Sequence, residues 1–458
     1  MSSYRPDPII LSLGADFYDP VDVAVFPKCV PRFVNEPWAE RIGLSFAATE
    51  WASHFCRFEP LADNLTEPLA LRYHGHQFRV YNPEIGDGRG FTFAQLRDES
   101  GRLLDLGTKG SGPTPYSRRA DGRLTLKGGI REVLATEMLE ALCVNTSKSF
   151  ALFETGEALE RGDEPSPTRS SVLTRLSHGH IRIGTFQRLA FFGDVDNLHK
   201  LTAYCLANLY SVEPTKDGAE NALRLFDLVS RATATMAASY LATGFVHGVL
   251  NSDNINVAGE SFDYGPWRFT QQWEPEFTAA YFDHYGLYAF GRQPEAIHWD
   301  LAQLGNCLSL VTEGAALSQT LAGWGERFEQ AMTGAMLNRL GILPADNDLE
   351  ITGALIRALG TKTHPIDRVF FDWRGGGDPG VERYPAPEFR VLAKLLDGRE
   401  QPRMHDYWSD EAPCSMHIEE VEAIWTAIAD NDDWQPFNNK VKAVRRMGEA
   451  MRQDAPAR

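Results

Sequence analysis

The pattern of apolar residues changes near residue 190, and this change constrains the fold more than any other feature of the chain. Between about residue 71 and residue 190, short apolar or alternating runs predict strands, and residues 129–143 predict one amphipathic helix packed on the sheet. Beyond residue 190, longer segments show helical periodicity. The predicted strands are residues 91–96, 102–106, 149–153, 172–176 and 181–184, and the later helices are residues 196–210, 218–242, 296–312, 314–339 and 416–430.

This order of elements predicts an α+β protein in which a β-rich part precedes a helical part. Residues 1–70 mix proline, aromatic residues and short apolar runs, and we expect them to form an N-terminal extension packed on the core. The β-rich part then covers residues 71–190 and the helical part residues 191–330. Residues 331–458 are expected to form a helical C-terminal extension.

Composition narrows the functional classes. The chain has 458 residues, 43% of them hydrophobic, which is enough for one large core or two lobes. Its net charge of −17 argues against a nucleic-acid partner, because such binding depends on lysine and arginine neutralising phosphates. A nucleotide can still bind in a local basic pocket. No apolar run approaches the ~18 residues of a membrane span and the start is unlike a targeting peptide, so the cytoplasm is the expected compartment.

The six cysteines, at positions 29, 56, 143, 205, 307 and 414, form no CxxC pair and no zinc-like spacing. We expect reduced thiols in the core or at the surface. His74 and His76 could lie on one face of a strand, but no third metal ligand has suitable spacing, so we interpret both as structural. The basic stretch from Lys440 predicts a last helix that packs Val441, Val444 and Met447 inward.

The most informative chemical motif is HGVLNSDN at residues 247–254, followed by Asp263. Strand signals on either side of the turn at residues 259–260 predict a hairpin that brings Asn254 and Asp263 together. Mg²⁺ prefers hard oxygen ligands and is usually held by one or two side chains plus substrate phosphates, so the set suits a nucleoside triphosphate. Asp253 would then accept a proton from an attacking hydroxyl. The alternative is an Asx turn at Asp253 and Asn254, with Asp263 on the surface.

Phosphate-binding candidates precede this motif. The loop with Gly86, Gly88 and Arg89 could bring backbone amides close to phosphate oxygens, although short glycine clusters are usually plain turns. Lys109 ends a predicted strand, where a lysine can contact phosphates while a helix glutamate pairs with it.

Glu132 and Glu137 are the candidate partners of Lys109. At about 100° per residue they point about 140° apart, so one lysine cannot face both, and we favour Glu132. Two unrelated surface charges are the alternative. Arg175 and Arg182 lie on successive predicted β segments and could converge on one anion, or could simply point to solvent.

Together these motifs resemble the selenoprotein O family of pseudokinase-fold enzymes. The resemblance spans about residues 70–315 and extends to the segment GLYAFGRQPEAIHWDL that begins at residue 286. The matching motifs are HGHQF from residue 74, GDGR from 86, KGSGPTPYSR from 109, DGR from 121, IRE from 130, HIRIG from 180, HGVLNSDN from 247 and DYGP from 263.

The resemblance implies a protein-kinase-like fold with a β-rich N-lobe and a helical C-lobe, and transfer of AMP from ATP to serine, threonine or tyrosine hydroxyls of proteins. It also implies Mg²⁺, with Mn²⁺ as a possible replacement, held by Asn254 and Asp263, with Asp253 as base and Glu132 paired to Lys109. The ATP-binding residues that it implies are Gly86, Gly88, Arg89, Lys109, Asp121, Gly122, Arg175, Arg182 and Asp263.

Residues 316–458 depart from the family pattern. They lack its Arg-Asn-His signature and a cysteine near the end, and Cys414 has no partner in sequence, which argues against redox control through a C-terminal cysteine. Two alternative functions are kept: a phosphotransferase that delivers the γ-phosphate, and an ATP-binding pseudoenzyme that acts as a scaffold.

Overall fold

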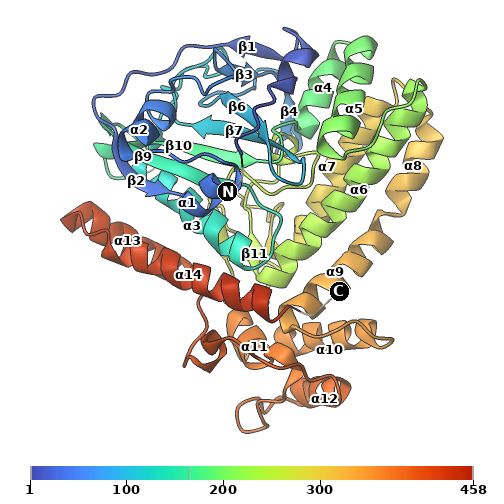
Figure 1. Cartoon of the computed structure of the whole chain (residues 1–458). Coiled ribbons are helices and arrows are strands. Elements are labelled where there is room, and N and C mark those ends of the chain that lie inside the picture. The colour runs from blue at the N-terminus through green and yellow to red at the C-terminus, as the bar shows by residue number, and fades with distance from the viewer. Residues whose placement is uncertain (1–2, 163, 456–458) are drawn as a thin grey trace.

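The computed structural model describes residues 3–162 and 164–455 and shows an α+β protein with an antiparallel sheet (Figure 1). The sheet has the strand order β1-β3-β6-β7-β10-β9-β2, and β8 pairs with β10 at its side. Its strands are β1 (Tyr18–Pro20), β2 (Val30–Val34), β3 (Leu69–Leu71), β6 (Thr92–Arg97), β7 (Leu103–Lys109), β8 (Leu124–Thr125), β9 (Lys148–Leu159) and β10 (Thr168–Ser177). Two small pairs are separate: β4 (Gly75–Gln77) with β5 (Val80–Asn82), and β11 (Phe245–Val246) with β12 (Arg268–Phe269).

The centre of the sheet follows from its sequence. Every residue of β7 is buried, as expected for a strand covered on both faces. The turn between β6 and β7 is closed by Asp98, whose carboxylate accepts hydrogen bonds from the backbone N–H groups of Ser100 and Arg102. The strands predicted at residues 91–96, 102–106, 149–153 and 172–176 are confirmed, each within a longer or slightly shifted strand.

Helices cover both faces of the sheet. Helix α3 (Leu126–Ala141) starts at Thr125, whose Oγ1 accepts a hydrogen bond from the backbone N–H of Gly128. This is the helix predicted at residues 129–143, and it packs against β9 and β10. An aromatic cluster that includes Phe55, Phe93 and Phe150 fills the other face, below α1 (Glu36–Arg41) and α2 (Ala48–Phe55).

The helices predicted beyond residue 190 are present, one of them as two separate helices. The strand predicted at residues 181–184 is wrong, because Ile183 begins helix α4 (Ile183–Phe191). The single helix predicted at residues 314–339 is broken at Gly323, giving α8 (Gly314–Ala322) and α9 (Trp324–Leu340). The other helices here are α5 (Val195–Leu209), α6 (Gly218–Thr243) and α7 (Gln293–Leu308).

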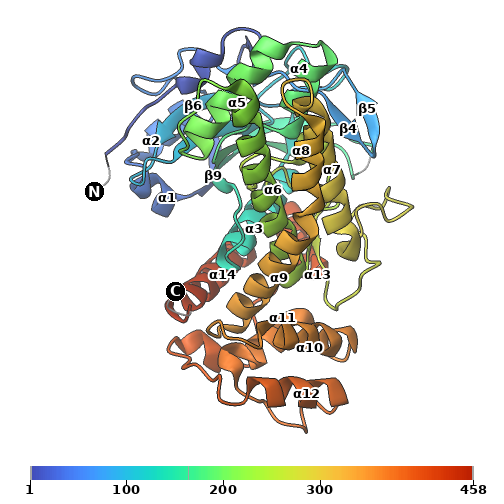
Figure 2. The ribbon, with the colours of Figure 1, turned by 90° about the vertical axis from the view of Figure 1, so that its right-hand side faces the viewer.

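The last two helices of the chain return to the side of the sheet that α3 covers (Figures 1 and 2). Helix α14 (Gln435–Gln453) packs against α3, and its Arg445 Nε donates to Glu137 Oε2 at 2.7 Å. Val441, Val444 and Met447 are buried as predicted, and the preceding Lys440 is buried too and bonds Glu420. The remaining helices are α10 (Asp348–Gly360), α11 (Ile366–Asp372), α12 (Pro387–Leu396) and α13 (Ile418–Asn431).

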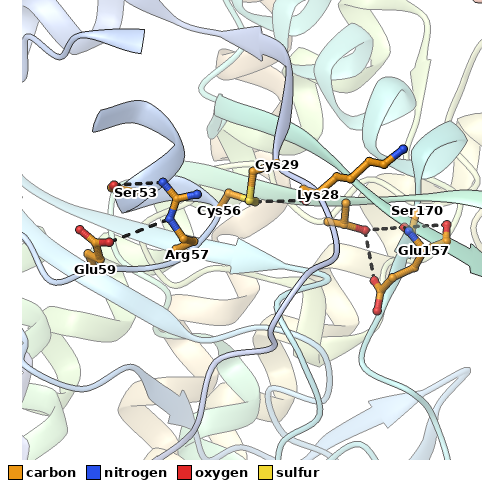
Figure 3. The surroundings of a disulfide bond; sticks show 9 residues. Lys28, Cys29, Ser53, Cys56, Arg57, Glu59, Glu157 and Ser170 are labelled. Carbon is orange, nitrogen blue, oxygen red and sulfur yellow. Dashed lines mark hydrogen bonds and ion pairs between the residues drawn. A yellow bond between two sulfur atoms is a disulfide. The ribbon is translucent and has the colours of Figure 1, made fainter. Parts of the chain in front are cut away.

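One prediction about cysteines is wrong. Cys29 and Cys56 form a disulfide that joins the residue before β2 to the end of α2 (Figure 3). The two Cα atoms are 6.0 Å apart although 27 positions separate the residues in sequence, and spacing alone could not reveal this approach. The four remaining cysteines, 143, 205, 307 and 414, are free thiols. Among the described helices, none is both long and apolar enough to span a bilayer.

Candidate nucleotide-binding and catalytic site

The ion pair between Lys109 and Glu132 lies at the centre of the candidate site. Lys109 ends β7, Glu132 is on the first half of α3, and the Lys109 ammonium contacts the Glu132 carboxylate in a buried setting. Glu137, five positions further along α3, faces away and pairs with Arg445. The two glutamates therefore point to different sides of α3, as expected from their separation of five positions along the helix.

Asp263 is the second partner of Lys109. Its Oδ1 lies 2.7 Å from Lys109 Nζ and 3.4 Å from Arg175 Nη1. Burial alone would raise the pKa of Asp263, but the charges of Lys109, Arg175 and Arg182 outweigh burial and hold that pKa well below its usual value. Asp263 has a left-handed backbone (φ 64°), which aspartate tolerates better than most residues. A fixed, ionised carboxylate of this kind suits a divalent cation.

Arg175 and Arg182 converge, although not on two strands. Arg175 is on β10, whereas Arg182 directly precedes α4. Both guanidinium groups lie over the ring of Phe262, at 5.7 and 5.0 Å from its centroid. Arg182 Nη2 lies 3.2 Å from Asp87 Oδ1, a partner that the sequence analysis did not single out. The buried Nε atoms of both arginines lack a hydrogen-bond partner among the described residues, so both retain donor capacity for an anion.

Asp253 lies in a short 3₁₀ turn, Ser252–Asn254, and is buried. Burial, with a smaller contribution from the charge of Asp263, raises the pKa of Asp253 from 3.8 to about 6, although Arg182 opposes the shift. Its Oδ1 has no hydrogen-bond partner among the described residues. A Cβ on Gly75 would lie 2.8 Å from that oxygen, so only glycine fits there without displacing the carboxylate. A carboxylate with one free oxygen and a pKa of about 6 suits a general base.

The hairpin predicted between Asn254 and Asp263 is not formed. Asn256 instead forms an antiparallel bridge with Arg182, and Ser261 forms a parallel bridge with Thr146. Two short apolar runs around a glycine resemble a hairpin in sequence, but here each run has a partner elsewhere in the chain. The charges of Asp253 and Asp263 nevertheless act on each other, so the two carboxylates belong to one site.

Asn254 is half-buried, and its Nδ2 donates to the carbonyl of Val249 at 3.0 Å. This bond fixes the amide and leaves its oxygen as the group that suits a cation. Within residues 3–162 and 164–455, no cluster of three or more His, Cys, Asp or Glu side chains could hold a metal ion. One carboxylate and one amide oxygen fit a Mg²⁺ ion whose other ligands are phosphates and water, and do not fit a dedicated protein cage.

The glycine loop at residues 86–90 packs on the segment that follows Lys109. The Ser117 hydroxyl donates to the carbonyl of Gly88, and the backbone N–H of Gly110 donates to the carbonyl of Arg89 at 2.6 Å. A Cβ on Gly86 would lie 2.5 Å from the ring of Tyr116, so glycine is required for this approach. The charge of Arg89 reaches Asp263, which places the loop at the site.

Asp121 and Gly122 lie differently from the other candidates. The Asp121 carboxylate pairs with Arg161 at 2.9 Å, on the surface. Gly122 has a left-handed backbone (φ 68°), and its Cβ would lie 2.2 Å from the backbone of Gly112, so it holds the loop after Lys109 in shape. The described contacts of Asp121 do not include the Lys109–Asp263 cluster.

The hairpin of β4 and β5 also borders the site, a role that the sequence analysis did not predict. The backbone N–H of His76 donates to Ser252 Oγ at 2.7 Å, directly beside Asp253. The ring of His74 bonds Tyr81 OH and that of His76 bonds the Gln187 side chain, so the two histidines are structural, as interpreted. The HGHQF motif from residue 74 is the sequence signal for this hairpin.

A strand lysine paired with a helix glutamate, beside clustered arginines and two carboxylates of unequal acidity, is typical of enzymes that act on nucleotide phosphates. Comparison with known proteins narrows this class to the nucleotidyltransferases. The family model described as "Protein adenylyltransferase SelO" matches residues 2–375, and the chain belongs to this family.

Curated relatives agree with this family. A protein of Gloeobacter violaceus named "Protein nucleotidyltransferase YdiU" is 43% identical over 96% of this chain and 95% of the relative. Proteins of the same name from Trichodesmium erythraeum and Synechocystis are 38% and 37% identical, each over 96% of this chain and 98% and 97% of the relatives. The chain is therefore an enzyme of the nucleotidyltransferase class.

Proposed function

We propose that this protein transfers AMP from ATP to serine, threonine or tyrosine hydroxyls of other proteins, with Mg²⁺, or Mn²⁺ in its place. The observation that carries the proposal is the buried cluster in which Lys109, Arg175 and Arg182 surround Asp263, with Asp253 beside them. Three cations suit the charge of a pyrophosphate leaving group. An acceptor hydroxyl that attacks the α-phosphorus would lose its proton to Asp253.

The proposed roles follow from the chemistry of each group. Lys109, positioned by Glu132, and the two arginines bind the phosphates, and Arg89, Gly86 and Gly88 line the same site. Asp263 and the Asn254 amide oxygen would hold the metal, which neutralises phosphate charge when bound. Gly122 shapes the loop after Lys109. Asp121 is proposed as an ATP-binding residue on the family resemblance alone, because its described contacts are with the surface residue Arg161 and the arginine at position 123.

The architecture proposed with this function is kinase-like and two-lobed. Residues 71–190 would be the N-lobe that carries Lys109, and residues 191–330 the C-lobe that carries Asp253. Residues 1–70 and 331–458 would be extensions on this core. The contacts of β1 and β2 with the sheet, and of α14 with α3, support this division. We propose no nucleic-acid or membrane partner, because the chain carries 62 acidic against 45 basic side chains.

ATP labelled at either the α- or the γ-phosphate tests the proposal. Incubation with a mixture of candidate proteins should leave the α-label on protein and release the γ-label as pyrophosphate. Retention of the γ-label would instead show a kinase. Saturable ATP binding without any labelled protein would show a scaffold.

Two variants test the roles of the carboxylates. Asp253→Ala should retain ATP binding and lose most transfer, whereas Asp263→Ala should lose metal-dependent ATP binding. Binding measured by calorimetry with and without Mg²⁺ separates the two effects. Undiminished α-label transfer by both variants would refute the assignment.

A further inference from the structure

Four large apolar side chains are exposed on two segments that hydrogen-bond to Asn251, close in sequence to Asp253. Tyr281, Phe282 and Tyr285 belong to the segment between β12 and α7, and Val80 belongs to the β4–β5 hairpin. Tyr285 is 93% exposed and Tyr281 79%. We call these four residues the aromatic patch. In Figure 2 the segment between β12 and α7, drawn in yellow, extends away from the helices on the same side of the molecule as β4 and β5.

The base of this segment is well anchored. The buried Asp283 carboxylate accepts hydrogen bonds from the backbone N–H groups of Leu287 and Tyr288, both at 2.8 Å. The Tyr288 hydroxyl donates to Asn251 Oδ1 at 2.7 Å. Asn251 is two positions before Asp253. The exposed rings are therefore held on an ordered support that is tied directly to the catalytic turn.

The hairpin is tied to the same asparagine. Its two turn residues, Phe78 and Arg79, both have positive φ (49° and 63°), a conformation that usually selects asparagine or glycine. The backbone N–H of Phe78 donates to Asn251 Oδ1 at 3.0 Å, and its ring lies 5.9 Å from that of Phe282. Unfavourable backbone geometry of this kind persists where the surrounding contacts enforce it, often at functional sites.

We propose that the aromatic patch docks the segment of the acceptor protein that presents the hydroxyl, and that it selects segments with apolar or aromatic residues next to that hydroxyl. The inference rests on the proposed transfer to proteins and adds a preference for sequence around the acceptor. Clustered exposed aromatic rings are typical of protein-binding surfaces, where tyrosine often contributes most to affinity. Phe282 of the patch packs beside Phe78, whose backbone N–H bonds Asn251, so the patch is tied to the turn that holds Asp253.

Charged side chains beside the patch are paired with one another. Glu295 is paired with both Arg79, at 3.0 Å, and Arg292, at 3.4 Å. Two arginines share this one carboxylate, so one net positive charge remains at the edge of the patch and disfavours basic segments.

Two peptide pools test the proposal. Each peptide has one serine, threonine or tyrosine as the acceptor, and the pools differ only in the flanking positions. In one pool these positions hold Leu, Phe and an analogue of Tyr that has no hydroxyl. In the other pool they hold Asp, Asn and Gly. With α-labelled ATP, the wild-type protein should label the apolar pool with kcat/KM about tenfold higher or more. The double variant Tyr281→Ala/Tyr285→Ala should lose this preference and keep its KM for ATP.

The control is Leu349→Ala/Val391→Ala. These side chains of α10 and α12 are 60% and 48% exposed and lie far from the β4–β5 hairpin (Figure 2), so this variant should keep the preference. Equal labelling of both pools by the wild-type protein, or a preference that survives in the tyrosine variant, overturns the proposal.

A binding measurement separates failure of docking from failure of the transfer reaction. Fluorescence anisotropy of the labelled apolar pool, without ATP, should show binding to the wild-type protein that the tyrosine variant loses. This result would support docking even if no label were transferred. Equal binding by both proteins would overturn it whatever the transfer assay shows.

Discussion

Replacing Asp253 by asparagine should stabilise the protein at neutral pH while it removes transfer activity. Asparagine keeps the shape of the side chain and cannot ionise. The pKa of Asp253 is raised from 3.8 to about 6 in the folded protein, mainly by burial, so folding favours the protonated form. Stability from this group is complete below about pH 4 and is lost as pH rises through about 6. The loss amounts to about 3 kcal/mol above pH 7, at about 1.4 kcal/mol per pKa unit.

Urea unfolding of both proteins, with a chelator and without nucleotide, measures this effect. The variant should be more stable by about 1.6 kcal/mol at pH 5 and about 3 kcal/mol at pH 7.5, from the same two pKa values. Asp263→Asn is the control of opposite sign. The pKa of Asp263 is held well below its usual value, so losing that charge should destabilise the protein at both pH values. A stability difference for Asp253→Asn that is zero, or that does not grow with pH, would refute the reasoning.

Three further predictions concern the ion pair, the disulfide and the metal. Glu132→Gln should raise the KM for ATP about tenfold, because one charge-assisted hydrogen bond is lost. Glu137→Gln on the same helix should leave that KM unchanged. Equal KM values for the two variants in steady-state label transfer would contradict this prediction. Replacing Cys29 and Cys56 by serine should lower the free energy of unfolding by about 3.5 kcal/mol, from the chain entropy of a 27-residue separation, and urea curves that coincide with the wild type would contradict it. A chelator should stop transfer and added Mg²⁺ or Mn²⁺ should restore it, and persistent transfer in the chelator would exclude the metal role of Asp263 and Asn254.

Sequence reasoning succeeded where the environment of a residue is set by its own helix or strand. The periodicity of residues 129–143 predicted α3 and its buried face. Helical phase alone separated Glu132 from Glu137, and the structure gives them different partners on different sides of that helix. The same logic predicted the buried residues of α14.

It failed where the partner of a segment lies far away in the chain. Residues 255–257 and 261–264 have the composition of two short strands, and only their distant partners, Arg182 and Thr146, show that they do not pair with each other. Cys29 and Cys56 likewise meet because β2 joins the sheet edge and α2 folds back over it. Periodicity describes local conformation, whereas these contacts depend on the assembled sheet.

The disulfide also bears on the expected compartment. Stable disulfides are rare in the cytoplasm of most cells, where such bonds are usually transient or redox-sensing. Only Cys29 and Cys56 are bonded to each other among the described cysteines, and the other four are free thiols. Alkylation of the protein directly on cell lysis, followed by mass analysis with and without reductant, would show whether the bond exists in the cell.

The two carboxylates of the site differ in proton affinity, and this difference supports the roles proposed for them. Asp263 is surrounded by Lys109, Arg175 and Arg182, so its low pKa keeps it ionised but makes it a poor proton acceptor. Asp253 has mainly burial acting on it, and its pKa of about 6 lets it take a proton from a hydroxyl and release it near neutral pH. Both carboxylates are mostly ionised at neutral pH, so they differ in how readily each accepts a proton and not in charge. Arg182 acts on both carboxylates, so the arginine that holds Asp263 ionised also limits how far the pKa of Asp253 can rise.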